Sequence, residues 1–376
     1  MTSWGGDVVD SPPTIYDVAA RAGVSIATVS RALNSLDSVR PSTRAKVLAA
    51  MEELEFVPNS VARGLSSGKH WILGLVFMRA TVNGSVLGVE EASLLYTDIV
   101  IRGAESRAAE YGYSLLLSSA DESHPSNMTS LLNLTGAVDG LILLDRVLKE
   151  EDVDYLAKRI PVVLLAGRGE VSTAVTVRVD NEEAMWSLTD HLVVEHGLTR
   201  LGFVSGSSDS PDSVARTNAF RTAARAKGAS LDEVDILESD WTSAGGETAM
   251  QRRLERSESL PEAFVCANDQ TAVGVIYALG SRGLRVPDDI AVTGFDDITL
   301  TRYFNPPLTT IRQSGSILGE VAVDALVKML DEPSAATSTI VLPTELVIRA
   351  SCGCVEPAES RMNFEGRVVP NAAVRS

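Results

Sequence analysis

Apolar positions recur along this chain with two different periods, and the change between them divides the chain in two. Over residues 15–22, 26–33 and 41–55 the apolar side chains repeat every three or four positions, which predicts three short helices. From Trp71 onward, continuous apolar runs of strand length alternate with amphipathic stretches of helix length. The pattern therefore predicts a small all-α domain followed by a larger α/β body.

The body is predicted to hold parallel sheets in two lobes, because continuous apolar strands joined by helices are typical of parallel sheets covered on both faces. About 280 residues are many for one doubly wound sheet. Strands are predicted over 71–77, 114–118, 140–144, 162–166, 175–179, 201–205, 263–267 and 290–295. Helices are predicted over 98–111, 126–134, 149–159, 181–196, 213–227, 243–256, 269–282 and 316–331. Left-handed helix ends are expected at Gly112, Gly228 and Gly283.

Three segments lack the periodicity of the two domains. Residues 1–13 are polar and are expected to form a flexible leader. Residues 58–70 carry one helical pattern that is too short to be stable alone, so they are expected to form a hinge helix and linker. Residues 353–376 are expected to form a tail. The all-α domain then occupies 14–57, and the body occupies 71–352.

The charge of the chain is distributed unevenly. The whole chain has 33 basic and 50 acidic residues, a net charge of −17. Residues 14–70 hold seven basic and five acidic residues, whereas residues 71–376 hold 26 and 43. A slightly basic head on an acidic body indicates that any nucleic-acid contact is made by the head.

The composition favours a protein of the cytoplasm. Three cysteines are too few for a disulfide framework, which suggests a reducing compartment. The first residues have no basic start and no apolar stretch, so no signal peptide is expected. The apolar runs are well short of the roughly 18 residues that a membrane span needs.

No arrangement of residues predicts an enzyme, a cofactor or a metal. The sequence has neither a P-loop nor an HExxH motif, and its histidines are scattered without a neighbouring nucleophile. Cys352 and Cys354 could suggest a metal, yet two thiols without histidine partners are a weak signal, so no metal site is expected. The four histidines are His70, His124, His191 and His196.

Residues 17–34 have the layout of a helix-turn-helix motif. Gly23 allows the tight turn, and Val29 and Leu33 would hold the second helix against the first. The start of the second helix is where such a motif contacts base edges.

Outward-facing residues of this second helix are candidates for reading DNA. Arg31 could place a bidentate fork on guanine, while Ile26 and Ala27 suit the methyl groups of thymine. Three short polar residues could position phosphates. They are Ser25, Thr28 and Asn34.

The segment from Thr14 to Arg63 begins Thr-Ile-Tyr-Asp-Val-Ala-Ala-Arg-Ala-Gly-Val-Ser and ends Val-Pro-Asn-Ser-Val-Ala-Arg. It resembles the lactose-repressor (LacI/GalR) family of bacterial transcription regulators. The resemblance resumes in the body and spans residues 14–350. Its body motifs are Asp180-Asn181, Ala267-Asn268-Asp269, Gly294-Phe295-Asp296-Asp297 and the run from Pro307 to Gln313. One departure is Arg40, where the family commonly has serine before the proline of the third helix.

The resemblance implies a DNA-binding repressor that acts as a homodimer on palindromic double-stranded operator DNA. A small-molecule effector, a sugar or sugar derivative, would bind between the lobes and control operator affinity. Asn59 and Ala62 would contact DNA, Asn59 at a phosphate. Leu65 would be the wedge that paired hinge helices push into the minor groove.

The body resembles type I periplasmic sugar-binding proteins. Their ligands bind beyond the carboxyl ends of the strands, and polar residues of this chain directly follow two predicted strands. A carboxylate, an amide and a guanidinium can bind vicinal hydroxyls, and an indole can cover a sugar ring. The resemblance carries effector-binding roles onto Arg216, Trp241, Asn268, Asp296 and Gln313.

The same resemblance divides the body. The N-lobe would comprise residues 71–178 plus 313–339, and the C-lobe residues 179–312 plus 340–352. Two segments depart from the family pattern, so part of the N-lobe contact set cannot be predicted. They are the long stretch 77–98, with Leu94-Leu95-Tyr96-Thr97, and Ala166-Gly167-Arg168.

Plainer interpretations remain open at several positions. Asp269 or Asp297 could only cap the helix that follows, and Trp241 could be a core residue. Arg168 could bind a charged group or only pair with Glu170. The same body without a regulatory role would be a solute-binding receptor of a transport system, but that protein would need a secretion signal and no helix-turn-helix.

Overall fold

The computed structural model divides the chain into two compact units, Met1–Trp71 and Ile72–Ser376. We call the first unit the head and the second the body. The structure describes residues 13–34, 39–56, 68–78, 95–120, 127–144, 147–148, 150–166, 173–332 and 338–354.

The head contains three short helices around its own apolar core. They are α1 (Ile15–Ala22), α2 (Ile26–Asn34) and α3 (Pro41–Glu53), as the periodicity predicts. The carboxylate of Asp17 accepts hydrogen bonds from the backbone and the hydroxyl of Thr14 and so fixes the start of α1. Gly23 has a φ of +67°, which lets the chain turn sharply between α1 and α2. Val29 is completely buried in the core.

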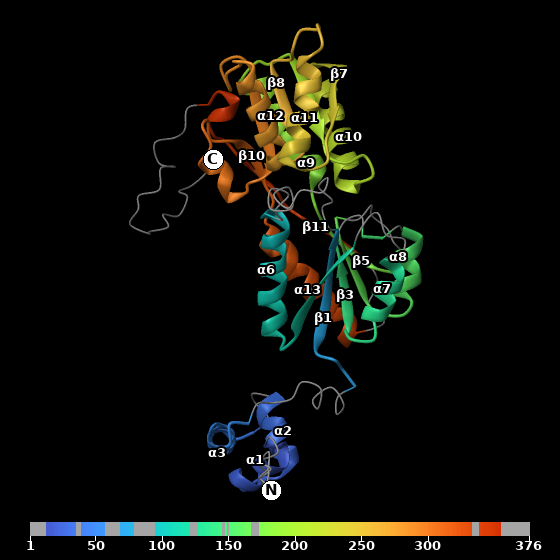
Figure 1. The fold of residues 1–376 in the computed structure, drawn as a ribbon, viewed down its shortest axis with the longest axis vertical. Helices are drawn as coiled ribbons and strands as arrows, with labels where there is room; N and C mark the ends of the chain where they lie inside the picture. Colours follow the sequence, from blue (N-terminus) through green and yellow to red (C-terminus); the bar gives the residue numbers. More distant parts are fainter. Residues whose placement is uncertain are drawn as a thin grey trace, which may run out of the picture. The chain divides into compact units, whose positions relative to one another are not determined.

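The N-lobe of the body is built on a six-stranded parallel sheet. Its strands lie in the order β11-β5-β4-β3-β1-β2. Helices α6 and α13 cover one face, and α7 and α8 cover the other (Figure 1). The strands are β1 (Ile72–Met78), β2 (Ser114–Ala120), β3 (Gly140–Leu143), β4 (Val162–Leu165), β5 (Val175–Val179) and β11 (Thr339–Leu342). The helices are α6 (Leu95–Glu110), α7 (Asn127–Leu134), α8 (Glu150–Ala157) and α13 (Gly315–Asp331).

The C-lobe repeats this plan with a second six-stranded sheet, in the order β12-β10-β9-β8-β6-β7. Only its edge strand β12 pairs antiparallel, against β10. Its strands are β6 (Arg200–Ser205), β7 (Ser230–Glu238), β8 (Ala263–Cys266), β9 (Ala291–Asp296), β10 (Thr309–Arg312) and β12 (Glu345–Val347). Its helices are α9 (Asn181–Asp190), the π-helix η1 (His191–Glu195), α10 (Pro211–Ala226), α11 (Ser243–Leu254), α12 (Asp269–Ser281) and the short η2 (Thr299–Arg302) and η3 (Ala350–Cys352).

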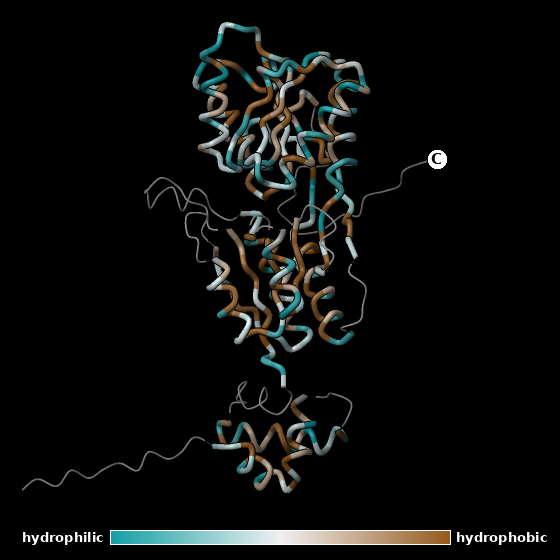
Figure 2. Tube along the Cα trace, turned by 90° about the vertical axis from the view of Figure 1, so that its right-hand side faces the viewer, coloured by the Kyte–Doolittle hydropathy of each residue, from teal (hydrophilic) through white to brown (hydrophobic). Residues whose placement is uncertain are grey.

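The chain crosses between the two sheets after β5, after β10 and after β11. One expected boundary is wrong in consequence. Residues 340–342 were expected in the C-lobe, but β11 pairs with β5 and belongs to the N-lobe sheet. Figure 2 shows hydrophobic chain concentrated in the strands at the centre of each lobe. This position fits strands buried on both faces.

Sequence periodicity misses four strands. The strand β7, Ser-Leu-Asp-Glu-Val-Asp-Ile-Leu-Glu, has no continuous apolar run. It lies at the edge of the sheet, where charged side chains can reach solvent. The strands β10, β11 and β12 have only three or four residues each and show no long apolar run. The three glycines predicted to end helices, Gly112, Gly228 and Gly283, all have φ values between +75° and +78°, which confirms that prediction.

Among the described residues, each lobe has a pair of helices that cross at a glycine. In the N-lobe a Cβ atom at Gly103 of α6 would overlap the backbone carbonyl of Ser316 in α13. In the C-lobe a Cβ atom at Gly274 of α12 would overlap the carbonyl of Ser243 in α11. Glycine is therefore required at both crossings, because any side chain would push the helices apart.

Candidate functional site

The start of α2 forms an exposed face on the head. Ile26 is 40% exposed, Ala27 and Arg31 are also exposed, and Thr28 is half-buried. The backbone nitrogen of Thr28 donates to the Ser25 hydroxyl at 3.2 Å, so Ser25 caps α2. The apolar and basic side chains of the first two turns are therefore exposed, and Arg31 Nε donates to the carbonyl of Ala27 at 3.2 Å.

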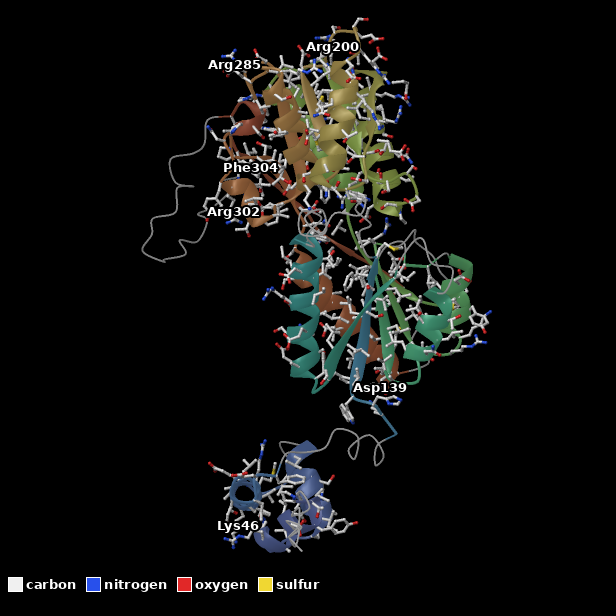
Figure 3. The ribbon with its side chains drawn as sticks, viewed as in Figure 1. Lys46, Asp139, Arg200, Arg285, Arg302 and Phe304 are labelled. Carbon is white, nitrogen blue, oxygen red and sulfur yellow. The ribbon has the colours of Figure 1, made fainter. Side chains whose placement is uncertain are left out.

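The other predicted DNA contacts cannot be placed in the same way. Asn34 ends α2, and its side chain is outside the described part of the structure. Asn59, Ala62 and Leu65 lie outside the described residues. Lys46 of α3 is exposed and points away from the core of the head (Figure 3).

The body contains a cavity of about 220 Å³ whose wall comes from both lobes. All five residues with a predicted effector role line it, and they come from different elements. The C-lobe lining also includes residues that the sequence did not single out. The five predicted residues are Arg216, Trp241, Asn268, Asp296 and Gln313, and the additional C-lobe residues are Ser210, Asp212 and Gln270.

Arg216 is buried in the cavity wall, with only 2% of its surface exposed. Its Nε donates to the Asn181 side chain at 2.8 Å, and its Nη1 donates to the carbonyl of Ala267 at 2.6 Å. Its guanidinium lies 3.5 Å from the ring centre of Phe295, and its Nη2 lies 3.7 Å from Asp212. The charge is therefore held at a fixed position by groups of the protein itself.

Asp296 ends β9 and points into the cavity. It has a φ of +119°, a conformation that residues with a side chain rarely adopt. The amide of Gln313 donates a hydrogen bond to its carboxylate. Burial raises the pKa of Asp296 to about 7, although the charge of Arg216 and the Gln313 hydrogen bond act in the opposite direction. The carboxyl group can therefore gain or lose a proton near neutral pH.

Trp241 is held in the cavity wall by its backbone. Its φ is +73°, and its carbonyl accepts a hydrogen bond of 3.0 Å from the Asn268 amide. A Cβ atom at Gly206 would overlap the indole, so the ring lies directly against that glycine. Ala166, Trp241 and Asp296 all line the cavity with left-handed backbone, and strained backbone of this kind clusters at functional sites.

Asn268 has a second role. Its side-chain oxygen accepts from the backbone nitrogen of Thr271 at 3.0 Å, so Asn268 is the cap of α12. The expectation that Asp269 could be that cap is wrong. Asp269 accepts from the backbone of Ile298 at 2.9 Å and from the Thr310 hydroxyl at 2.6 Å.

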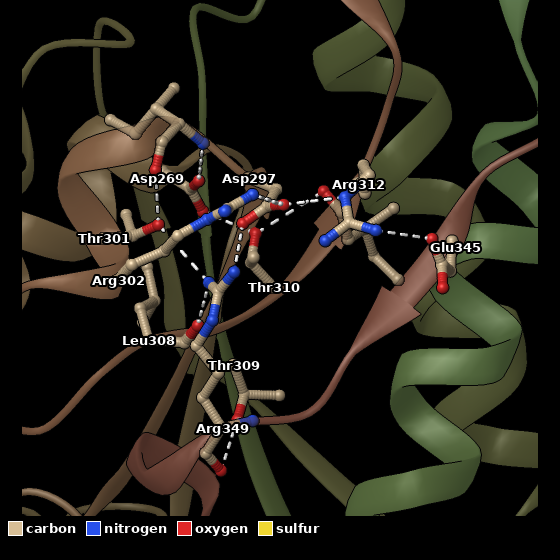
Figure 4. Close-up of polar contacts among 12 residues, drawn as sticks. Asp269, Asp297, Thr301, Arg302, Leu308, Thr309, Thr310, Arg312, Glu345 and Arg349 are labelled. Atoms are coloured by element: carbon tan, nitrogen blue, oxygen red, sulfur yellow. Dashed lines mark hydrogen bonds and ion pairs between the residues drawn. The ribbon is translucent and has the colours of Figure 1, made fainter. Parts of the chain in front are cut away.

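Asp297 does not cap a helix either, as Figure 4 shows. It accepts from the buried Arg349, from Arg312 at 2.7 Å and from Arg302 at 3.3 Å. Burial alone would raise the pKa of Asp297, but the hydrogen bonds of Arg349 and Arg312 lower it. The ion cluster ties the end of β9 to β10 and to the segment before η3.

The N-lobe contributes a more apolar wall. Tyr96 and Thr97 come from α6, which the sequence places in the stretch that departs from the family pattern. Arg178 adds the one basic side chain among the described N-lobe residues of the wall. Burial and the nearby Asp296 raise the pKa of Tyr96 well above its ordinary value. Arg168 lies outside the described residues.

One sequence expectation about metals has to be corrected. No metal site was expected at Cys352 and Cys354, as two thiols without histidine partners. The fold brings His191 and His196 to both thiols.

No helix in the described part of the chain is long and apolar enough to cross a membrane.

Comparison with known proteins agrees with both units. Residues 14–59 match the family model for bacterial regulatory proteins of the lacI family, and residues 189–352 match the periplasmic binding protein-like domain. Catabolite control protein A of Priestia megaterium is 34% identical over 341 residues, which cover 90% of this chain and 98% of that protein. The HTH-type transcriptional repressor PurR of Pasteurella multocida is 30% identical over 345 residues, with the same coverage.

Solved structures give the same result. The Lac repressor dimer bound to operator and an anti-inducer has a TM-score of 0.74 and 28% identity, covering 91% of this chain and 99% of that one. The transcriptional regulator CelR in complex with cellobiose has a TM-score of 0.67 and 28% identity, covering 90% and 99%. These relatives are transcription regulators and not enzymes. The chain belongs to the LacI family of bacterial DNA-binding transcription regulators.

Proposed function

We propose that this protein is a cytoplasmic repressor that binds a palindromic operator as a homodimer and is controlled by a small-molecule effector. The observation that carries the proposal is the combination, in one chain, of an exposed helix-turn-helix face with a cavity between two lobes. A two-fold symmetric protein suits a two-fold symmetric DNA site. The acidic body would be repelled by DNA, which helps to confine contact to the head.

In this proposal α2 reads the major groove. Arg31 would pair with guanine, and Ile26 and Ala27 would contact thymine methyl groups. Ser25, Thr28 and Asn34 would position phosphates. Asn59, Ala62 and Leu65 would act in a hinge helix, with Leu65 as the minor-groove wedge.

The effector is proposed to be a sugar or sugar derivative. The cavity brings together carboxylates, amides, a fixed guanidinium and an indole, which suit hydroxyl groups around a small ring. Its volume of about 220 Å³ is below the roughly 300–1,000 Å³ of pockets for drug-sized ligands, which favours a small molecule. The cellobiose complex of the similar regulator CelR supports this class.

Effector and operator would be coupled through the arrangement of the two lobes. An effector that prefers one arrangement changes operator affinity by a coupling free energy of about 1–3 kcal/mol. By thermodynamic reciprocity, operator DNA must change effector affinity by the same factor.

Selection from a randomised palindrome by gel shift tests DNA binding. We expect enrichment of a symmetric site, and the proposal fails if nothing is enriched at low salt. For Arg31→Ala we expect a loss of sequence preference of about 1–3 kcal/mol with non-specific binding retained. Equal weakening on all sequences would contradict the role of Arg31.

A thermal-shift screen of the purified protein against sugars, polyols and nucleobases tests the effector class. A ligand at 100 times its dissociation constant should add about 2.7 kcal/mol to the free energy of unfolding. Stabilisation by a nucleobase and by no sugar would overturn the sugar proposal and leave the repressor proposal standing.

A further inference from the structure

Two histidines and two cysteines from distant parts of the sequence meet in the C-lobe. His191 begins the π-helix η1, and His196 directly follows it. Cys352 ends η3, and Cys354 lies two residues beyond. Their donor atoms, one per residue, all lie within 4.8 Å of one another. The effector cavity does not include any of the four residues.

The cluster lies at the opposite end of the sheet from the cavity. The hydroxyl of Thr309, the first residue of β10, donates to Cys352 Sγ at 3.1 Å. Asp296 and Gln313, at the other ends of β9 and β10, line the cavity. The two sites are therefore separated by the length of the strands.

Four of the six distances between the donor atoms are close to those of a tetrahedral metal site. His191 Nε2 lies 3.2 Å from His196 Nε2, 3.4 Å from Cys352 Sγ and 3.7 Å from Cys354 Sγ. His196 Nε2 lies 3.3 Å from Cys354 Sγ. A tetrahedral zinc site, with bonds of about 2.0–2.1 Å to nitrogen and about 2.3 Å to sulfur, has edges of about 3.3 Å between nitrogens and about 3.6 Å between nitrogen and sulfur. These four distances, 3.2–3.7 Å, agree with the calculated edges to within about 0.3 Å.

Hydrogen bonds alone do not account for this convergence. A ring nitrogen carries either one proton or one lone pair, directed along a single line. His191 Nε2 nevertheless has three potential partners within 3.7 Å. One hydrogen bond can serve only one of them, whereas a cation at the common centre would be bound by all four donor atoms.

The local backbone holds the four side chains together. In an α-helix, residues five apart are rotated by about 140° and face different sides. The wider π-turn brings His196 back to His191, with ring centres 4.8 Å apart, and π-bulges are frequent at functional sites. Gly353 has a φ of +100°, which lets the chain turn between the two cysteines.

The second segment is anchored just as firmly. The Ser351 hydroxyl donates to the carbonyl of Val292 at 2.5 Å and accepts from the backbone nitrogen of Thr309 at 2.8 Å. Ser351 is completely buried, and Cys352 is 3% exposed. Cys352 is therefore fixed relative to β9 and β10.

We propose that His191, His196, Cys352 and Cys354 form a Cys2His2 site for a tetrahedral divalent metal ion, with zinc as the metal that this donor set favours. The imidazoles bind as neutral ligands. The two thiols lose their protons to solvent and bind as thiolates, so the loaded site is formally neutral. Four protein ligands close the coordination sphere, which is typical of structural zinc. The ion fastens the segment 350–354 to the end of helix α9–η1.

The test uses the full chain, stripped with a chelator and titrated with zinc and with cobalt. We expect one zinc ion per chain by elemental analysis, and visible absorption bands of tetrahedral cobalt together with sulfur-to-cobalt charge transfer. Zinc should raise the melting temperature of the wild-type protein. Cys354→Ser and His196→Gln, both at partly exposed positions, should each lower zinc affinity more than about 100-fold. Even the loss of a residue that only hydrogen-bonds to a metal ligand costs about 10–100-fold.

His70→Gln is the matched control, because it makes the same chemical change in the head and should leave zinc binding unchanged. Three results overturn the proposal: no stoichiometric zinc on the folded wild-type chain, equal zinc affinity in the wild-type protein and folded variants, or a Cys352–Cys354 disulfide that persists in reducing buffer. The cobalt spectrum of the wild-type protein decides the question even if a variant does not fold. None of these measurements depends on operator or effector binding.

Discussion

The N-lobe and the C-lobe share a strand order and a glycine-packed helix pair, but they differ in where charge is buried. The buried charged residues of the described body lie in the C-lobe, in its helices and strands or directly beside them. They are Arg216, Asp235, Arg253, Asp269, Asp296, Asp297 and Arg349. The N-lobe face of the cavity is mostly apolar.

Under the proposed function, this difference gives the two lobes different parts in effector binding. The C-lobe groups are oriented by hydrogen bonds to one another before any ligand arrives, so little ordering remains to be done on binding. The N-lobe supplies a mostly apolar wall with a few polar groups. We therefore expect affinity to depend mainly on the C-lobe.

The largest expected effect is on stability, from Asp297→Ala. The change leaves the buried Arg349 without its carboxylate, and breaking a buried ion pair costs about 3–5 kcal/mol. Urea denaturation should show this loss. Asp98→Ala removes an exposed pair with Arg102 from the N-lobe and should cost at most about 1 kcal/mol. Equal losses would contradict the contrast between the lobes.

A second effect concerns pH. Burial raises the pKa of Asp296 to about 7 and that of Asp269 well above its ordinary value. A raised pKa in the folded state favours folding at low pH, and this contribution is lost as pH rises from about 4 to about 7. Asp296→Asn should therefore reduce the loss of stability across this range by up to about 4 kcal/mol, since one unit of pKa corresponds to about 1.4 kcal/mol.

Chemical denaturation at pH 4 and pH 8 measures this loss of stability. Asp98→Asn is the control for removing one carboxylate from an exposed position. An Asp296→Asn protein with the wild-type pH dependence would show that Asp296 titrates as in the unfolded chain.

The shared feature of the lobes gives a third prediction. Gly103→Ala and Gly274→Ala each force two helices apart and should cost about 1–3 kcal/mol, seen as lower melting temperatures. Gly280→Ala is the control, because a Cβ atom there meets no neighbouring atom within 4 Å. A tolerated alanine at either crossing would mean that its helix pair can separate freely.

The smallest expected effect is on the free energy of effector binding, and this prediction rests on the proposed function. It compares the loss of one polar contact from each lobe. Asp296→Asn removes a charged acceptor and should weaken binding by about 1.5–3 kcal/mol. Tyr96→Phe removes a neutral hydroxyl of the N-lobe wall and should weaken it by about 0.5–1.5 kcal/mol. Calorimetry with the ligand found by thermal shift measures both. The reverse order would place the main affinity in the N-lobe.

The sequence predicts the long apolar strands, most helices and the five cavity residues that follow strand ends or family motifs. It does not predict β7, because this edge strand contains charged residues and lacks the continuous apolar run of a central strand. It also misses Tyr96 and Asp212, which reach the cavity only because distant segments fold together. The histidine and cysteine cluster is missed for the same reason, since more than 150 positions separate its halves and a π-turn aligns the histidines.

The three passages of the chain between its sheets have a consequence for synthesis on the ribosome. The head has its own core and is complete once α3 has emerged. The N-lobe sheet cannot be completed until β11, residues Thr339–Leu342, has been made. At a synthesis rate of about 5–20 residues per second, the head is complete roughly 15–60 s before the N-lobe sheet. Any nascent or truncated chain that stops before β11 thus carries a complete helical head without a finished body to control it.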